Sequence, residues 1–456
     1  MNYHFIAIGG SAMHNLAIAL HKKGDVVTGS DDDIFEPSRS RLLKYGLLPK
    51  KKGWYENRIN DNIDAVILGM HAHADNPELL KAQEKGIPIY SYPEFLYNQT
   101  QHKKRVVIGG SHGKTSTTAI ILHVLKYFNK TFDYMVGAQL EGFDTMVEFL
   151  DDSEVAIFEG DEYLTSPLDL RPKFHLYKPT IALITGIAWD HINVFPTVDN
   201  YIEQFSIFID KIEEGGYLVY FNEDINILKI IKESGRKDIK MIPYTTPEYD
   251  IVNGITYLLD GEDRVPLKVF GKHNLQNISG AKQICSLLGI SNSDFYLAIK
   301  DFPGASKRLQ LLGSNEKVSV YLDFAHSPSK LKATIDAVKQ QYINKKLIAC
   351  MELHTYSSLN KDFLLQYNGT MDNADSAIVF YSEHALKLKK MEEIDDGIIE
   401  ESFGKDGLIV MKNKDFIKDK ILSMDLSNSV LLFLTSGSFD GINFEEITNK
   451  ILDINK

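Results

Sequence analysis

The feature that most constrains the fold is a glycine-rich run between a short apolar segment and a long apolar helix. The run Gly110-Ser111-His112-Gly113-Lys114-Thr115-Ser116 follows a predicted strand at residues 105–108 and precedes a predicted helix at residues 118–127. Backbone N–H groups in such a loop can hold phosphate oxygens, Lys114 can reach terminal phosphates, and the Thr115 hydroxyl can bind Mg²⁺. Ile108 stands where the usual phosphate-loop pattern has its first glycine. An ordinary glycine turn is the alternative, but it does not explain why strand, Gly-Lys-Thr and helix coincide.

The residues before this loop predict a separate βαβ unit. A buried strand at residues 3–8 leads through Gly9 and Gly10 into a helix that ends near Lys23, and a second strand at residues 26–29 ends at Ser30-Asp31. This order is typical of a nucleotide-binding domain. Further strands are predicted at residues 65–68 and 87–90, and the polar stretch 98–104 is interpreted as a linker.

Strands and helices continue to alternate after the phosphate loop. Near Phe302-Pro303-Gly304-Ala305 the pattern breaks, and it restarts with a strand at residues 318–322 and a helix at residues 328–341. Alternation of this kind predicts parallel sheets with ligands at the carboxyl ends of the strands. We therefore expect an α/β protein with three domains, at residues 1–100, 101–311 and 312–456.

Composition excludes several classes of function. With 456 residues, about two to four domains are expected. A net charge of -12 argues against binding of nucleic acid or an anionic membrane. Cys285 and Cys350 are too few for a disulfide framework or a zinc site. Without a signal-like N-terminus or a run of roughly 18 apolar residues, a cytoplasmic location is expected.

Two groups of possible metal ligands follow predicted strands of the second domain. Glu159, Asp161 and Glu162 come directly after an apolar strand, where carboxylates could bind the metal that bridges nucleotide phosphates. Asp190 and His191 follow the next strand and could serve a metal or a phosphate. Taken alone, a helix-capping Asp with a hydrogen-bonded His is the more ordinary reading of this pair.

Later polar residues could contact a nucleotide. Asn274 and Asn277 are one helical turn apart and share a face. Arg308 suits a phosphate, and Asp323 at the end of a predicted strand suits a ribose or a metal. His326 follows in the same loop.

Taken in order, these clusters resemble the Mur ligases of peptidoglycan synthesis over essentially the whole chain. The resemblance implies an ATP-dependent ligase that joins an amine to a carboxylate by way of an acyl phosphate. It also implies an N-terminal Rossmann-like UDP-sugar domain, a central P-loop ATPase domain and a C-terminal Rossmann-like domain for the amino acid or peptide. ATP and Mg²⁺ are the expected cofactors, and the implied processes are cell wall biogenesis, cell shape and cell division. The oligomeric state is left open.

The resemblance assigns a role to each motif. It implies that Lys114 contacts the ATP phosphates within the loop from Gly110 to Ser116, that Thr115, Glu159 and His191 hold the metal, and that His326 faces the reacting amine. The further nucleotide contacts that it implies are Asn274, Asn277, Arg308 and Asp323. The implied UDP-sugar contacts are Gly9, Gly10, Ser11, Met13, Ser30 and Asp31. The base that deprotonates the amine is left open among His191, His326 and a nearby carboxylate.

Within the family, the chain is most similar to the branch that acts on UDP-N-acetylmuramic acid. One enzyme of that branch adds L-alanine, and another adds a recycled muropeptide, the tripeptide L-alanyl-γ-D-glutamyl-meso-diaminopimelate. Residues 29–38, 158–163 and 436–442 favour the tripeptide and thus peptidoglycan recycling. Two stretches depart from this pattern: Gly186 and Ala188 replace an Asn and an acid that family members often carry, and residues 352–358 are more similar to the alanine-adding enzyme.

Other functions are compatible with parts of the sequence. Folylpolyglutamate synthase and cyanophycin synthetase share the ATPase core, but the βαβ domain before the phosphate loop disfavours the folate enzyme. A nicotinamide-dependent oxidoreductase is disfavoured because residues 9–14 do not match G-x-G-x-x-G. A nucleotide-binding regulator without catalytic activity stays open as the alternative from a different class.

Overall fold

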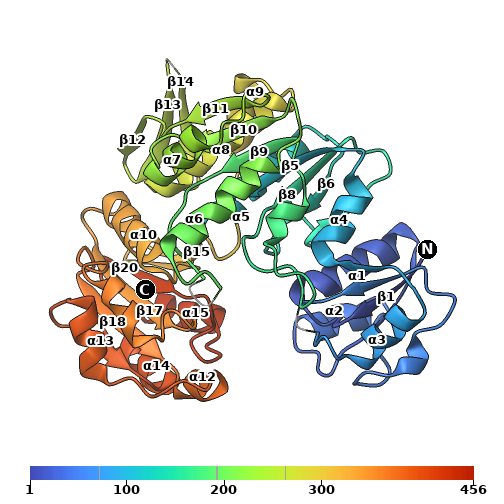
Figure 1. Ribbon diagram of the computed structural model, residues 1–456. Helices are drawn as coiled ribbons and strands as arrows, with labels where there is room; N and C mark the ends of the chain where they lie inside the picture. Colours follow the sequence, from blue (N-terminus) through green and yellow to red (C-terminus); the bar gives the residue numbers. More distant parts are fainter. Residues whose placement is uncertain (71, 192–193, 262, 456) are drawn as a thin grey trace. The chain divides into compact units, whose positions relative to one another are not determined.

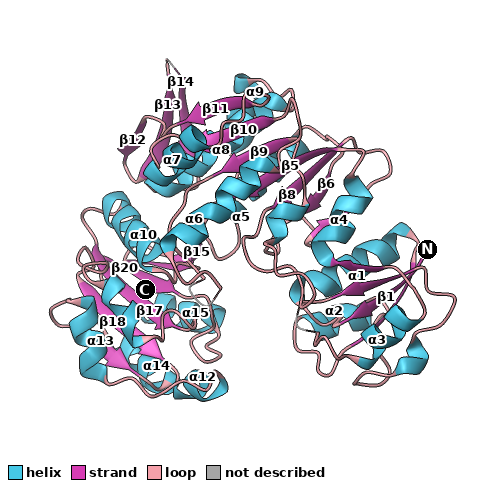
Figure 2. Cartoon of the chain, viewed as in Figure 1, coloured by secondary structure: helices cyan, strands magenta, loops and turns pink. Residues whose placement is uncertain are grey.

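The computed structural model describes residues 1–70, 72–191, 194–261 and 263–455. The chain divides into two compact units, whose elements are labelled in Figure 1. Unit 1 comprises Met1–Trp189, Pro196–Thr245 and Asn277–Ala298, and unit 2 comprises Asp190–Phe195, Thr246–Gln276 and Ile299–Lys456. Helices flank the sheets in both units (Figure 2).

The N-terminal part of unit 1 is a four-stranded parallel sheet in the order β2-β1-β3-β4. Its strands are β1 (Asn2–Ile6), β2 (Val26–Ser30), β3 (Ala65–Leu68) and β4 (Ile89–Ser91). Its helices are α1 (Ser11–Lys23), α2 (Ser38–Lys44), the 3₁₀ helix η1 (Glu56–Arg58), α3 (Pro77–Glu84) and α4 (Tyr92–Thr100).

Two local predictions for this domain were wrong. The first strand was expected to reach Ile8, but β1 ends at Ile6 because Ala7 takes a left-handed φ of 66°. The linker predicted at residues 98–104 is largely regular structure, since α4 continues to Thr100 and the next strand begins at Lys104.

The rest of unit 1 is built on a seven-stranded sheet in the order β11-β10-β9-β5-β8-β6-β7, in which only β7 is antiparallel to its neighbour. Its strands are β5 (Lys104–Gly109), β6 (Asp133–Met135), β7 (Val147–Glu148), β8 (Val155–Glu159), β9 (Ile181–Ile184), β10 (Tyr217–Phe221) and β11 (Lys240–Tyr244). Its helices are α5 (Lys114–Tyr127), η2 (Lys173–Leu176), α6 (Val198–Asp210), α7 (Ile225–Glu233) and α9 (Asn292–Ile299), and α8 (Lys272–Leu287) begins in unit 2. Because β5 pairs with both β8 and β9, the loop after β5 starts between the ends of these two strands.

Unit 2 contains two sheets. The smaller is an antiparallel sheet of β12 (Tyr249–Val252), β13 (Ile255–Asp260) and β14 (Asp263–Leu267), which the sequence reading missed. The larger has six strands in the order β15-β16-β20-β17-β18-β19, with β15 antiparallel to β16 and the other pairs parallel. Its strands are β15 (Gln310–Ser314), β16 (Val318–Asp323), β17 (Lys346–Leu353), β18 (Ser376–Tyr381), β19 (Ile409–Met411) and β20 (Ser429–Leu434). Its helices are α10 (Pro328–Gln341), α11 (Lys361–Leu364), η3 (Leu365–Tyr367), α12 (Glu383–Leu388), α13 (Asp396–Phe403), α14 (Lys414–Ser423) and α15 (Phe444–Ile454).

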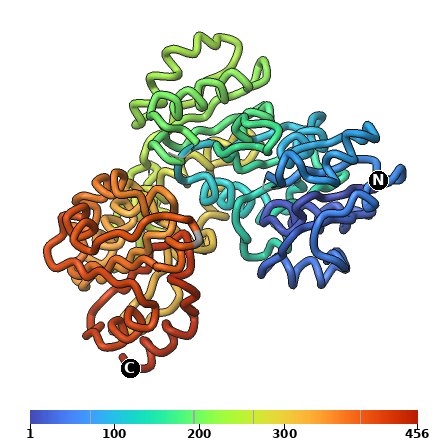
Figure 3. The backbone as a smooth tube through the Cα atoms, turned by 60° about the horizontal axis from the view of Figure 1, so that its bottom comes forward, coloured from blue at the N-terminus to red at the C-terminus, as the bar shows by residue number. Residues whose placement is uncertain are grey.

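The six-stranded sheet is buried by apolar side chains in two clusters. One cluster contains Leu331 and Ile335 of α10, and the other contains Ile417 and Ile421 of α14. The blue N-terminal stretch and the orange-to-red C-terminal stretch of the chain each fold on themselves (Figure 3), and each contains a sheet of its own. These sheets and the seven-stranded sheet give the three-domain α/β fold that the sequence predicted; the domain boundaries at residues 100 and 311 stay predictions. In the part of the chain described above, no helix is long and apolar enough to cross a bilayer.

Candidate active site

The glycine-rich loop joins β5 to α5 at the carboxyl edge of the seven-stranded sheet. A Cβ at Gly110 would lie 2.0 Å from Thr185 Oγ1, and a Cβ at Gly113 would lie 2.3 Å from Asn277 Oδ1. Both glycines also have positive φ angles, of 137° and 79°, so both positions require glycine. The loop therefore lies directly against Asn277, one of the predicted nucleotide contacts.

Lys114, at the start of α5, is paired with a buried carboxylate. Its Nζ donates to Glu162 Oε2 at 2.6 Å and to the carbonyl oxygen of Gly110 at 2.5 Å. Burial alone would lower the pKa of Lys114, but the charges of Glu162, Asp161 and Glu159 outweigh it and raise that pKa. The ammonium group is therefore charged at neutral pH, as a group that binds phosphate oxygens must be.

A chain of hydrogen bonds fixes the second oxygen of Glu162. The Tyr201 hydroxyl of α6 lies 3.0 Å from Glu162 Oε1 and 2.9 Å from Ser111 Oγ. Ser111 Oγ accepts from the Ala188 N–H at 2.9 Å. Because a carboxylate can only accept, the Tyr201 proton points to Glu162, and the Ser111 hydroxyl donates to Tyr201. The chain thus runs from the phosphate loop through Tyr201 to the partner of Lys114.

Thr115 and Glu159, two of the predicted Mg²⁺ ligands, lie side by side. Thr115 Oγ1 donates to Glu159 Oε1 at 2.7 Å, and the Gly137 N–H donates to Glu159 Oε2 at 2.7 Å. Neighbouring ligands of an octahedral Mg²⁺ with bonds of about 2.1 Å are about 3.0 Å apart, close to the separation of these two oxygens. Among the residues that the structure describes, no group of three or more His, Cys, Asp or Glu could hold a metal. In proteins, Mg²⁺ usually takes one or two carboxylates and completes its shell with water and phosphate oxygens.

Asp190 and His191, which follow β9 along the chain, belong to unit 2. Asp190 Oδ2 is 3.5 Å from Lys330 Nζ of α10. Burial would raise the pKa of Asp190, but the nearby charge of Lys330, the largest lowering influence, holds it well below its usual range. His326 Nδ1 lies 2.9 Å from the Phe324 carbonyl oxygen. Burial, aided by the charge of Lys330, lowers the pKa of His326 to about 4, so this ring is uncharged at neutral pH.

The other predicted nucleotide contacts of unit 2 have local partners. The Asn274 side-chain N–H donates to the Phe270 carbonyl oxygen at 2.9 Å. The Arg308 guanidinium lies over the Phe324 ring, 4.4 Å from its centroid, and Asp323 accepts from the Thr334 hydroxyl at 3.2 Å. Arg308 and Asp323 are thereby held next to Phe324. Their roles toward a nucleotide, like those of His191 and His326, stay predictions.

The predicted UDP-sugar residues gather at the carboxyl edge of the N-terminal sheet. The Gly9 N–H donates to Asp31 Oδ2 at 2.7 Å, which ties the turn after β1 to the end of β2. Burial raises the pKa of Asp31 to about 6. The Ser30 hydroxyl donates to Glu78, a fully buried carboxylate that His4 also contacts.

The other three predicted UDP-sugar contacts are Gly10, Ser11 and Met13, which belong to the turn after β1 and to the start of α1. The Gly10 carbonyl oxygen receives the His14 N–H at 2.9 Å as α1 begins. The Ser11 hydroxyl lies 3.8 Å from Met146 Sδ, and Met13 is buried. Ser11 is thus exposed at the helix start, whereas Met13 contributes to packing.

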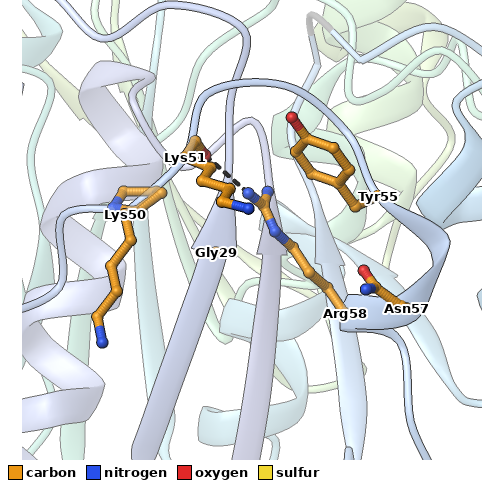
Figure 4. A pocket seen from close by; sticks show the side chains of 7 residues that line it. Gly29, Lys50, Lys51, Tyr55, Asn57 and Arg58 are labelled. Carbon is orange, nitrogen blue, oxygen red and sulfur yellow. Dashed lines mark hydrogen bonds between the residues drawn. The ribbon is translucent and has the colours of Figure 1, made fainter.

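A pocket opens beside Gly29 at the edge of this sheet (Figure 4). Its volume is about 260 Å³, and its lining residues are Gly29, Pro49, Lys50, Lys51, Tyr55, Asn57 and Arg58. Arg58 braces the loop by donating to the Lys51 carbonyl oxygen at 2.7 Å, and it also contacts Glu78 Oε1 at 3.4 Å. Three basic side chains give the pocket a positive potential, which suits an anionic group.

The sequence did not reveal two residues that contact the site motifs from distant parts of the chain. Tyr201 and Lys330 lie on helices far along the chain from the motifs that they contact, and neither position carries a local signal. Gly186, noted above as a departure from the family pattern, has a structural reason. A Cβ at Gly186 would lie 2.4 Å from His112 Cε1, so the glycine makes room for the ring of the phosphate loop.

The chain is similar to known proteins over most of its length. Residues 2–104 match the description "Mur ligase family, catalytic domain", residues 108–285 match "Mur ligase middle domain", and residues 307–437 match "Mur ligase, glutamate ligase domain". A UDP-N-acetylmuramate–L-alanine ligase of Clostridium botulinum (strain Hall) is 31% identical over 397 residues, which cover 82% of each chain. The enzyme of the same name from Caldicellulosiruptor bescii is 31% identical over 396 residues, 83% of each chain.

Solved structures of two kinds share the fold. A murein peptide ligase from Psychrobacter arcticus superposes with a TM-score of 0.67 at 21% identity, covering 99% of this chain and 98% of the other. A UDP-N-acetylmuramate-alanine ligase from Thermotoga maritima superposes with a TM-score of 0.73 at 20% identity, covering 100% and 99%.

Proposed function

Because the chain belongs to the Mur ligase family, whose members form amide bonds with ATP and Mg²⁺ in peptidoglycan synthesis, we propose that it joins UDP-N-acetylmuramic acid to L-alanyl-γ-D-glutamyl-meso-diaminopimelate. The observation that carries the ligase chemistry is the phosphate loop. Its lysine is held charged by Glu162, and Thr115 at the start of α5 donates to Glu159 at the end of β8.

In the first step, the lactyl carboxylate of the sugar attacks the γ-phosphoryl group of ATP. Lys114 stabilises the negative charge that spreads over the transferred oxygens. Thr115 and Glu159 would hold Mg²⁺, which neutralises charge on the β- and γ-phosphates when bound. Glu162 and Tyr201 keep Lys114 directed at the loop, so the charge is in place before ATP arrives.

In the second step, the free amine of the acceptor displaces phosphate from the acyl phosphate. We assign the UDP-sugar to one region of the N-terminal domain. It consists of Gly9, Ser30 and Asp31 together with the basic pocket of Lys50, Lys51 and Arg58. A carboxyl edge of parallel strands is where α/β domains bind nucleotides. The remaining proposed contacts are Asn274, Asn277, Arg308 and Asp323 for ATP, and His191 for the metal.

The choice of acceptor rests on three segments and has one rival. Residues 29–38, 158–163 and 436–442 are similar to muropeptide ligases, and the segment 436–442 follows β20 at the carboxyl edge of the C-terminal sheet. L-alanine is the second candidate, because the relatives described above carry the name of an L-alanine ligase.

Phosphate release from ATP tests the proposal. Purified protein is given UDP-N-acetylmuramic acid with the tripeptide, with L-alanine or with no acceptor. We expect release that requires the tripeptide and that Lys114→Ala abolishes. Release with L-alanine alone would move the assignment to the alanine-adding enzyme, and no release with either acceptor would refute the ligase assignment for this chain.

A further inference from the structure

A buried carboxylate and a partly exposed imidazole stand together at the carboxyl edge of the six-stranded sheet. Glu352 lies near the end of β17 and His354 follows it, while Ser436 and Gly437 follow the neighbouring strand β20. The two strands run parallel and paired, so their carboxyl ends lie side by side. Ligands of α/β sheets bind at this edge. The segments that contain these residues entered the choice of acceptor above, but no catalytic role has been assigned to Glu352 or His354.

Glu352 is held in the charged form. It is 1% exposed, and its Oε2 accepts from the Thr435 hydroxyl and, at 2.9 Å, from the Phe439 N–H. Burial would raise the pKa of Glu352, but these hydrogen bonds and His354 lower it overall. Its other oxygen, Oε1, faces His354 Nδ1 at 3.6 Å. A carboxylate in this position favours the tautomer with a proton on Nδ1 and leaves Nε2 as the acceptor.

The loop after β20 closes on this pair from the other side. A Cβ at Gly437 would lie 2.7 Å from His354 Nδ1 and 2.8 Å from Glu352 Oε2, so only glycine fits there. The His354 side chain is nevertheless 38% exposed and can meet a ligand. The groups that face its ring are thus the Glu352 carboxylate of β17 and the uncharged backbone of Gly437.

A second observation points to a ligand at the same place. The hydroxyl oxygen of Ser436, adjacent to Gly437, is buried and has no hydrogen-bond partner within the described part of the chain. A buried hydroxyl without a partner is destabilising, and a bound polar group would remove that cost. An ammonium group, which has three donors and no acceptor, would suit a hydroxyl oxygen, a neutral imidazole nitrogen and a nearby carboxylate.

We propose that His354, oriented by Glu352, is the base that deprotonates the ammonium group of the acceptor. The inference rests on the proposed function, since it requires an amine acceptor. The proton passes from nitrogen to His354 Nε2, and the freed lone pair forms the C–N bond at the acyl carbon. The C–O bond to phosphate then breaks, and phosphate leaves with its electron pair. Glu352 balances the charge of the imidazolium, as a carboxylate does beside a catalytic histidine in general.

The test separates the two half-reactions. Hydroxylamine is already uncharged at neutral pH, so it traps the acyl phosphate as a hydroxamate without a base; amide formation with the tripeptide needs one. Both are measured for the unaltered protein, His354→Gln, Glu352→Gln and the control His384→Gln. His384 is exposed and lies in α12, after the neighbouring strand β18.

We expect His354→Gln to lower amide formation by about 10²- to 10⁴-fold, the usual contribution of a general base, with hydroxamate formation unchanged. Glu352→Gln should lower amide formation as well, again with hydroxamate formation unchanged, because the carboxylate stabilises the imidazolium. His384→Gln should leave both reactions unchanged.

Two results would overturn the inference alone: normal amide formation in His354→Gln, or an equal loss of hydroxamate and amide, which would indicate a structural role. Absence of hydroxamate with the unaltered protein would instead overturn the proposed function, and this inference with it.

Discussion

Removing the Tyr201 hydroxyl tests whether the buried chain behind Lys114 matters for activity. Tyr201→Phe deletes one oxygen, which donates to Glu162 Oε1 at 3.0 Å and lies 2.9 Å from Ser111 Oγ. The ring itself is fully buried and keeps its packing. Glu162 then loses one of the partners that hold its carboxylate against Lys114.

The expected loss follows from the strength of such a bond. A hydrogen bond to a charged group is worth about 1.5–3 kcal/mol. If the whole amount is lost from the transition state, kcat/KM for ATP falls by about 10- to 150-fold, because each 1.36 kcal/mol corresponds to about tenfold in rate. We expect the loss in this range.

Tyr177→Phe is the matched control. Tyr177 is also fully buried in unit 1, and its hydroxyl has no partner among the described residues. Removal of a buried hydroxyl without a partner is close to neutral. Acceptor-dependent phosphate release against ATP concentration, with thermal unfolding in parallel, compares the two variants. Equal activity in both variants, or a loss in Tyr201→Phe that matches only a loss of folded protein, would refute the reasoning.

Three further outcomes follow from the structure. Glu159→Gln should raise the Mg²⁺ concentration for half-maximal activity at least about tenfold, because a neutral amide replaces the carboxylate beside Thr115; an unchanged Mg²⁺ titration would remove Glu159 from the metal site. Gly113→Ala should weaken ATP binding, because the new Cβ would lie 2.3 Å from Asn277 and a residue other than glycine at a φ of 79° costs about 1–3 kcal/mol. The control Gly235→Ala, whose Cβ would enter open space, should leave ATP binding unchanged. Burial lowers the pKa of His175 from 6.5 to about 4, so the unfolded chain binds more protons than the folded chain between pH 6.5 and pH 4. The free energy of unfolding should therefore fall by about 3 kcal/mol as the pH drops from 6.5 to 4. Calorimetry should show a shallower fall in His175→Gln.

Local patterns predicted most of the elements that carry the site. Helix α10 has the predicted bounds, because Pro328 marks its first residue and its apolar spacing is regular. The phosphate loop was predicted because strand, glycines, lysine and helix are contiguous. Helix α4 was not predicted, and its end was interpreted as a linker because Asn98, Gln99 and Thr100 are polar, although the Ser91–Glu94 capping box starts a helix that includes them.

Contacts between distant segments could not be predicted in the same way. Tyr201 has the spacing of a core residue on α6, and nothing near it indicates a bond to Glu162. His354 and Gly437 are more than eighty residues apart and meet only because β20 is inserted beside β17 in the sheet. Which distant residues come into contact therefore depends on the strand order, and the strand order depends on the packing of the whole domain.

Competition between acceptors tests the central proposal most directly. The protein is incubated with ATP, Mg²⁺, UDP-N-acetylmuramic acid and equimolar tripeptide and L-alanine, and the products are identified by mass. We predict that the UDP-N-acetylmuramoyl tripeptide is the main product. A product that carries L-alanine alone, or no amide product while ATP is still consumed, would contradict the account.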